Sequence, residues 1–85
     1  MKPLIRHLVE QKRFECTVDG NVAYVEYIER CGTFDIVHTY VPKAVSGRGI
    51  ASALVAAAYE YADSNNLAKR GSCPYAALWL ERNTK

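Results

Sequence analysis

The stretch VSGRGIASALV, residues 45–55, places two glycines on either side of an arginine, directly before an alanine-rich segment. Glycine loses more conformational freedom on folding than any other residue, so its use at a helix start needs a physical reason. The loop is either a tight turn that reverses the chain, or a site where backbone N–H groups at a helix N-terminus meet an anion such as phosphate. In the second case the binding residues are Ser46, Gly47, Arg48, Gly49, Ile50, Ala51 and Ser52.

Two common glycine motifs do not fit this loop. A nucleotide-binding P-loop ends in Gly-Lys followed by Ser or Thr, and no such pair follows these glycines. A dinucleotide fingerprint needs a third glycine where Ser52 stands, and an acidic residue about twenty positions on, where Leu67 stands. Both classes of nucleotide site are therefore excluded.

Cys73 directly precedes Pro74. Proline at the first position of a helix forces its predecessor into extended backbone, which is the geometry of a helix N-cap. A thiol there lies beside the positive end of the helix, and Lys69 and Arg70 are close in sequence, so we expect a lowered pKa for Cys73. The thiol is then an acyl-accepting nucleophile, a proton donor to a departing thiolate, or a buried and inert side chain.

Two further side chains are candidates for proton transfer. His38 alternates with Phe34, Ile36 and Tyr40, so we expect it on the same side of a strand as these residues, either as a hydrogen-bonded core residue or as a base. Tyr75, one residue into the last predicted helix, is either a core residue or a proton donor. Isolated histidines and scattered carboxylates predict no metal site.

The elements that must position these residues fall into two halves. β-Branched and aromatic residues predict antiparallel strands over 13–18, 21–30 and 33–41, joined by turns at Asp19-Gly20 and Cys31-Gly32 and ended by Pro42. Residues 4–10, LIRHLVE, suit either another strand or a short helix.

After Pro42 the apolar period changes from two residues to three or four, which predicts a helix from about residue 49 to residue 64. Residues 67–73 are a candidate for a short strand, and PYAALWLERN, starting at Pro74, predicts a second helix. The sequence therefore predicts an α/β chain of the mixed α+β type, with a mostly antiparallel sheet of four or five strands followed by two helices.

The composition limits the class of protein. A chain of 85 residues with 49% hydrophobic residues predicts one compact domain over residues 1–85. Its net charge of +2, without a block of like charges, does not indicate a nucleic-acid partner. No apolar run is long enough to span a membrane. Three cysteines without metal-type spacing, and a charged N-terminal stretch, favour a reduced, cytoplasmic location.

The hexad SGRGIA, residues 46–51, resembles the pyrophosphate loop of the GNAT acetyltransferase superfamily, written Q/R-x-x-G-x-G/A. Gly49 and Ala51 occupy its last two fixed positions, and Ser46 stands where the family prefers Gln or Arg. HTYVPKAVSGRGIASALV, with SCPY and a short final helix downstream, is similar to the minimal, single-domain YjdJ-type acetyltransferases over residues 14–83. That family usually has an acidic residue after His-Thr, where this chain has Tyr40.

The resemblance implies a GNAT-type fold and transfer of an acetyl group from acetyl-CoA to an amine of a small molecule or a protein. It places the diphosphate on residues 46–52 and the pantetheine along the strand that ends at Val41, whose neighbouring backbone N–H stabilises the oxyanion. Cys73 or Tyr75 protonates the CoA thiolate, and His38 or water is the base; an acyl-Cys73 intermediate is the alternative mechanism. The alternative function is a non-catalytic acyl-CoA-binding module. The acceptor and the oligomeric state stay open.

Overall fold

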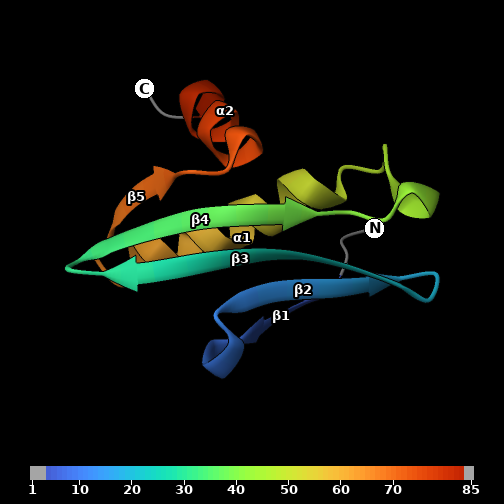
Figure 1. The fold of residues 1–85 in the computed structure, drawn as a ribbon, viewed down its shortest axis with the longest axis horizontal. Coiled ribbons are helices and arrows are strands. Elements are labelled where there is room, and N and C mark those ends of the chain that lie inside the picture. The colour runs from blue at the N-terminus through green and yellow to red at the C-terminus, as the bar shows by residue number, and fades with distance from the viewer. Residues whose placement is uncertain (1–3, 84–85) are drawn as a thin grey trace.

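The computed structural model describes residues 4–83 and has the mixed α/β architecture that the sequence predicts. Five strands form one sheet in the order β1-β2-β3-β4-β5, in which the first three pairs are antiparallel and β4–β5 is parallel (Figure 1). Helix α1 connects β4 to β5, and α2 follows β5. The elements are β1 (Ile5–Leu8), a 3-10 turn (Val9–Gln11), β2 (Arg13–Val18), β3 (Asn21–Arg30), β4 (Thr33–Tyr40), a second 3-10 turn (Lys43–Val45), α1 (Ile50–Ser64), β5 (Ala68–Gly71) and α2 (Pro74–Asn83).

The two hairpins form where the sequence predicts them. The turn residues Asp19 and Gly20 both have positive φ angles, of 50° and 76°, and Cys31 and Gly32 have 52° and 79°. Two consecutive positive angles are typical of the two-residue turns that match the twist of antiparallel strands. Residues 4–10 combine both predicted structures, because the strand β1 is followed directly by a 3-10 turn.

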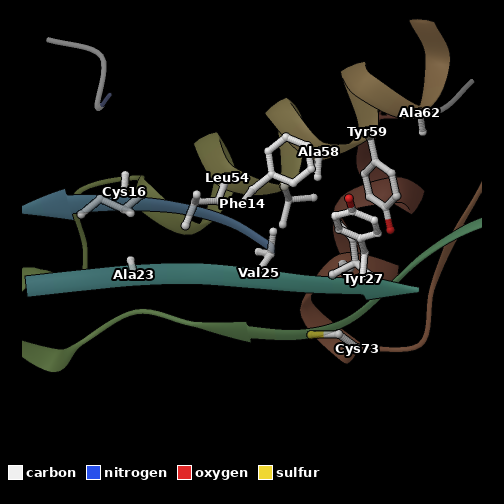
Figure 2. Packing of buried hydrophobic residues seen from close by; sticks show 14 of the residues in the cluster. Phe14, Cys16, Ala23, Val25, Tyr27, Leu54, Ala58, Tyr59, Ala62 and Cys73 are labelled. Carbon is white, nitrogen blue, oxygen red and sulfur yellow. The ribbon is translucent and has the colours of Figure 1, made fainter. Parts of the chain in front are cut away.

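The core lies between α1 and one face of the sheet, which we call the helix face. Helix α1 directs Leu54, Ala58 and Tyr59 toward Val25 and Tyr27 of β3 (Figure 2). These side chains are nearly inaccessible to solvent, as the three- and four-residue spacing of α1 and the alternation of β3 predict. The opposite side of the sheet is called the outer face below.

A β-bulge interrupts the pairing of β3 with β4. Glu26 lies opposite His38, and the next residue of β3, Tyr27, lies opposite Ile36. Val37 is therefore an extra residue that has no partner in β3. Since side chains of a strand alternate between faces, one inserted residue exchanges the faces of every side chain after it.

The bulge corrects the predicted position of His38. Phe34 and Ile36 are buried on the helix face, but His38 lies on the outer face beside Tyr24, with 5.8 Å between the ring centroids. The prediction that His38 shares a side with Phe34 and Ile36 is wrong, because strict alternation does not hold across the bulge. Thr39 occupies the helix face instead.

Strand β5 accompanies β4 over only part of its length. The parallel pairing runs from Thr33↔Ala68 to Ile36↔Gly71, and one further hydrogen bond joins the amide of Cys73 to the carbonyl of Ile36 at 3.0 Å. Within residues 4–83, the remainder of β4 has no strand beside it on this side (Figure 1). The sheet therefore splits at Ile36 and leaves an open backbone edge.

Gly71 lets α2 pack directly on β5 at this split. A Cβ atom added to Gly71 would lie 2.6 Å from the backbone nitrogen of Ala77 and 2.8 Å from the carbonyl carbon of Ala76. Both contacts are with helix backbone, which cannot rotate away as a side chain can. The close approach fixes the position of the first turn of α2 relative to the sheet.

We expect Gly71→Ala to destabilise the fold by about 1–3 kcal/mol, because overpacking against backbone forces the helix to shift. In a domain of this size the melting temperature should fall by about 4–8 °C for each kcal/mol. Ala68→Ser, at an exposed position of the same strand, is the control and should leave the melting temperature within about 2 °C. Equal melting temperatures for Gly71→Ala and wild type would contradict the close packing of α2 on β5.

Candidate active site

The loop before α1 presents backbone N–H groups in a glycine-dependent conformation. Gly47 and Gly49 have φ angles of 80° and 76°, a region that side chains rarely enter, and a Cβ atom at either position would meet open space. The first helical hydrogen bond runs from the amide of Ala53 to the carbonyl of Gly49 at 3.0 Å. The amides of Ile50, Ala51 and Ser52 therefore precede the helical ladder and are suited to bind an anion.

These residues line a hollow of about 260 Å³ at the N-terminus of α1. It brings together all of the predicted cofactor-binding residues except Arg48, and adds Tyr75 from the first turn of α2. The lining residues are Val41, Ser46, Gly47, Gly49, Ile50, Ala51, Ser52 and Tyr75. The end of β4 and the N-termini of both helices thus meet at one place.

The two polar side chains of the loop are engaged elsewhere in the fold. The Ser46 hydroxyl donates to the carbonyl of Lys43 at 2.9 Å and so closes the 3-10 turn before the loop. Arg48 donates from Nη1 to Oδ2 of Asp19 at 2.6 Å, which joins the loop to the turn between β2 and β3. The groups of this loop that are left to meet an anion are therefore first its backbone amides.

Cys73 is the N-cap of α2, as the sequence predicts. The carbonyl of Cys73 accepts the first helical hydrogen bond, from the amide of Ala77, at 2.9 Å. Its side chain is 8% exposed, and the thiol lies 3.4 Å from Oγ1 of Thr39 on the helix face of β4. The thiol therefore faces the side of β4 that lies just beyond the split.

Burial raises the pKa of the Cys73 thiol, but hydrogen bonds to the sulfur from the Thr39 hydroxyl and from the amides of Ala76 and Tyr75 outweigh it, so the pKa lies below its ordinary value. The predicted direction is confirmed, and the predicted cause is only partly right. Lys69 and Arg70 are paired with acidic side chains of their own, Asp63 at 3.0 Å and Asp35 at 3.7 Å.

Tyr75 lies in the first turn of α2 and is 39% exposed toward the hollow. A neighbouring hollow of about 300 Å³, formed mainly by α2, shares Tyr75 and Ser52 with the first one. The indole N–H of Trp79 donates to the hydroxyl of Ser52 at 3.3 Å, and the Trp79 ring packs on Tyr59 with 5.7 Å between centroids. Trp79 thus fixes the spacing of the two helices that form the site.

His38 is separated from Cys73 and Tyr75 by the sheet. Its ring and that of Tyr40 both contact Tyr24 on the outer face, at 5.8 Å and 5.5 Å between centroids. The three predicted catalytic residues therefore do not form one cluster. Thr39, the residue that does contact Cys73, is absent from the sequence prediction because only the bulge at Val37 directs it to the helix face.

The described residues 4–83 hold no group of three or more His, Cys, Asp or Glu side chains arranged to bind a metal ion. In the same range, no helix has the length and apolar character needed to cross a bilayer.

The family model described as GCN5-related N-acetyl-transferase matches residues 13–85. The chain belongs to this family. Protein NATD1 of Xenopus tropicalis is 30% identical over 83 residues, which cover 93% of this chain and 75% of that protein. The NMR solution structure of a GCN5-like protein from Staphylococcus aureus is similar with a TM-score of 0.74 and 27% identity, over 95% of this chain and 80% of that one.

The GCN5-related family and the fold neighbour confirm both the resemblance to the GNAT superfamily and the predicted sheet followed by two helices. The match from residue 13 onward spans the meander, the loop before α1 and both helices. The hollow at the N-terminus of α1 thus belongs to an N-acetyltransferase-like fold.

We expect Thr39→Val to raise the pKa of Cys73, because it removes a hydrogen bond to the thiolate. The pH dependence of alkylation by iodoacetamide, followed by peptide mapping, measures each cysteine separately. Cys73 should titrate below Cys16, whose pKa is raised by burial.

Thr17→Val, an exposed position on β2, is the matched control and should leave the Cys73 midpoint unchanged. An unchanged Cys73 midpoint in Thr39→Val would show that this hydroxyl does not stabilise the thiolate.

Proposed function

We propose that this protein transfers an acetyl group from acetyl-CoA to a primary amine. The observation that carries the proposal is the junction of the open edge of β4 with the hollow at the N-terminus of α1. An extended thioester arm with a diphosphate at one end needs a strand edge that continues into an anion site. In this fold the unpaired edge of β4 leads to Val41, which lines the hollow at the N-terminus of α1.

The diphosphate would lie on the backbone amides of Ile50, Ala51 and Ser52. The helix N-terminus contributes a partial positive charge there, and the open space above Gly47 and Gly49 admits a bulky anion. A phosphate ester needs several donors from one direction, and successive amides at a helix start provide them.

The pantetheine arm would extend along β4 between Ile36 and Val41, where β5 has diverged. Its amide groups can pair with the exposed backbone of β4 as an added strand would. This direction carries the thioester from the hollow toward the bulge. A backbone N–H near Val41 would then stabilise the oxyanion that forms when the carbonyl carbon is attacked.

Direct transfer agrees better with the surroundings of Cys73 than an acyl-cysteine intermediate does. In direct transfer the amine nitrogen attacks the thioester carbon, the carbon–sulfur bond breaks, and the CoA thiolate takes up a proton. Tyr75 is exposed to the hollow and can supply that proton. Cys73 is 8% exposed and engaged with Thr39, so we assign it to the wall of the acetyl site, with proton donation as its second role.

The amine proton would pass to His38 or to water on the outer face. His38 lies directly after the bulge, opposite Glu26, at the part of β4 whose other edge is open. A histidine base matches proton transfer near neutral pH. An acceptor that approaches from the outer face would meet the thioester across the strand from Cys73.

We expect CoA and acetyl-CoA to stabilise the wild type, and NAD and ATP to do so weakly or not at all. At about one hundred times the dissociation constant, a ligand specific for the folded state adds roughly 2.7 kcal/mol. Each kcal/mol corresponds to about 4–8 °C in the melting temperature of so small a domain. Ser52→Asp should abolish the shift, because it places a carboxylate among the amides that would hold the diphosphate.

An acidic residue in the first turn of a helix stabilises that helix, so Ser52→Asp should fold. A loss of the CoA-induced shift in this variant would therefore report lost binding and not an unfolded protein. Ser52→Asn, which has nearly the same shape without the charge, is the control and should retain most of the shift. If CoA gives no shift with the wild type at saturating concentration, the proposed cosubstrate is wrong.

We expect release of CoA from acetyl-CoA to depend on an amine acceptor from a panel of polyamines, lysine peptides and peptides with free N-termini. Tyr75→Phe or His38→Ala should reduce this release by about 10²-fold, the low end for the loss of a general acid or base. Cys73→Ser, which keeps a small polar side chain at the N-cap, should retain turnover if transfer is direct.

Complete loss of turnover in Cys73→Ser, together with an acetylated Cys73 in the wild type, would establish the covalent route instead. Tight CoA binding without acceptor-dependent release across the panel would identify an acyl-CoA-binding module.

A further inference from the structure

We propose that Asp19, in the turn between β2 and β3, sets the affinity of the loop before α1 for phosphorylated ligands by competing with them for Arg48. The inference rests on the proposed binding of CoA at this loop. It concerns an acidic residue 29 positions from Arg48 in sequence that no motif connects to the loop.

The ion pair between Asp19 and Arg48 joins two loops that lie at the same end of the molecule. The turn that follows β2 reaches toward the loop between β4 and α1 (Figure 1). Nη1 of Arg48 lies 2.6 Å from Oδ2 of Asp19, and the side chains are 52% and 67% exposed. A pair so exposed to water is weak, so a stronger partner can replace it.

A diphosphate on the amides of Ile50, Ala51 and Ser52 would be such a partner. It carries more negative charge than one carboxylate and accepts bidentate hydrogen bonds from a guanidinium group. Arg48 stands between Gly47 and Gly49, beside those amides, so it can turn from Asp19 to a bound phosphate without a change in the fold.

Two costs of binding follow from the presence of Asp19. The Asp19–Arg48 bond must break before Arg48 can contact the ligand, and the carboxylate that is then left without its partner repels the bound phosphates. Both costs disappear when Asp19 loses its charge. Asp19 is therefore an affinity-setting residue for the anion at this loop, although it lies outside the hollow.

Asp19→Asn tests the proposal with little risk to the fold. Asp19 has a φ of 50°, and asparagine tolerates this left-handed conformation at least as well as aspartate does. The backbone carbonyl of Asp19, which accepts a hydrogen bond from Asn21, is unchanged.

Asp63→Asn is the matched control. Asp63 is similarly exposed, at 61%, and is also paired with a basic side chain, Lys69 at 3.0 Å. It lies near the other end of α1, roughly 16 Å from Ser52 along the helix axis at 1.5 Å per residue, which exceeds the screening length at physiological salt. Both variants change the net charge of the protein equally.

Titration calorimetry with CoA at about 0.1 M salt, where the screening length is about 10 Å, should show a dissociation constant about two- to five-fold lower for Asp19→Asn than for wild type. Asp63→Asn should match wild type. The difference should vanish near 0.5 M salt, because exposed charges are then screened. Equal constants for wild type and Asp19→Asn at the lower salt concentration would overturn the proposal while leaving CoA binding itself established.

The double variant identifies the mechanism. Arg48→Gln alone should weaken CoA binding by about three- to ten-fold. In the Arg48→Gln background most of the gain from Asp19→Asn should be lost, because no arginine is then present to turn from Asp19 to the phosphate. Fully additive effects of the two substitutions would show that the Asp19 carboxylate acts only by electrostatic repulsion of the ligand. That result would contradict the proposed competition for Arg48.

Truncated ligands locate the phosphate that Arg48 meets. Dephospho-CoA keeps the diphosphate, so the gain from Asp19→Asn should persist with it, whereas pantetheine has no phosphate and should bind both proteins equally. A gain that required the 3′-phosphate of CoA would contradict an exchange onto the diphosphate. If CoA binds to no variant and not to wild type, the proposed function fails and this inference fails with it.

Discussion

The hydrogen bond from the amide of Cys73 to the carbonyl of Ile36 is the backbone bond that ends the pairing of β4 with the chain of β5. Up to this bond the two strands pair in parallel, and beyond it the chain turns into α2 while β4 continues alone to Tyr40. The bulge at Val37 follows Ile36 directly. Strand β5 therefore leaves one edge of β4 at Ile36, directly before the bulge on the other edge of β4. The candidate site lies around this position.

The position of this hydrogen bond depends on how closely α2 approaches the sheet. Because Gly71 has no side chain, the backbone of α2 packs closer to β5 than a Cβ atom would allow. Helix α2 can therefore begin directly after β5. The N-terminus of α1 reaches the same hollow from the other direction, and Trp79 connects the two helices through Ser52. Two positive helix ends near one cavity favour a bound anion and a thiolate on the protein.

Basic side chains contribute less to this site than their proximity in sequence indicates. Arg48, Lys69 and Arg70 are each paired with an aspartate: Asp19 in the turn after β2, Asp63 at the end of α1 and Asp35 in β4, respectively. In the proposed function, the attraction for an anion would therefore come mainly from backbone amides, whose direction is fixed by the fold. In the proposed binding of CoA, a charged side chain near the loop would adjust the affinity, while the loop conformation would determine whether an anion can bind.

The sequence by itself determined the elements, because hydrophobic period, turn residues and proline positions act locally. It placed the hairpins at Asp19-Gly20 and Cys31-Gly32, the start of α1 at the glycine loop, and Cys73 at the N-cap of α2. Only the tertiary structure decided which side chains face each other. A single extra residue, Val37, moved His38 to the outer face and brought Thr39 to Cys73, and Asp19 reached Arg48 across 29 positions. Such pairings depend on strand register and loop packing, which no local pattern encodes.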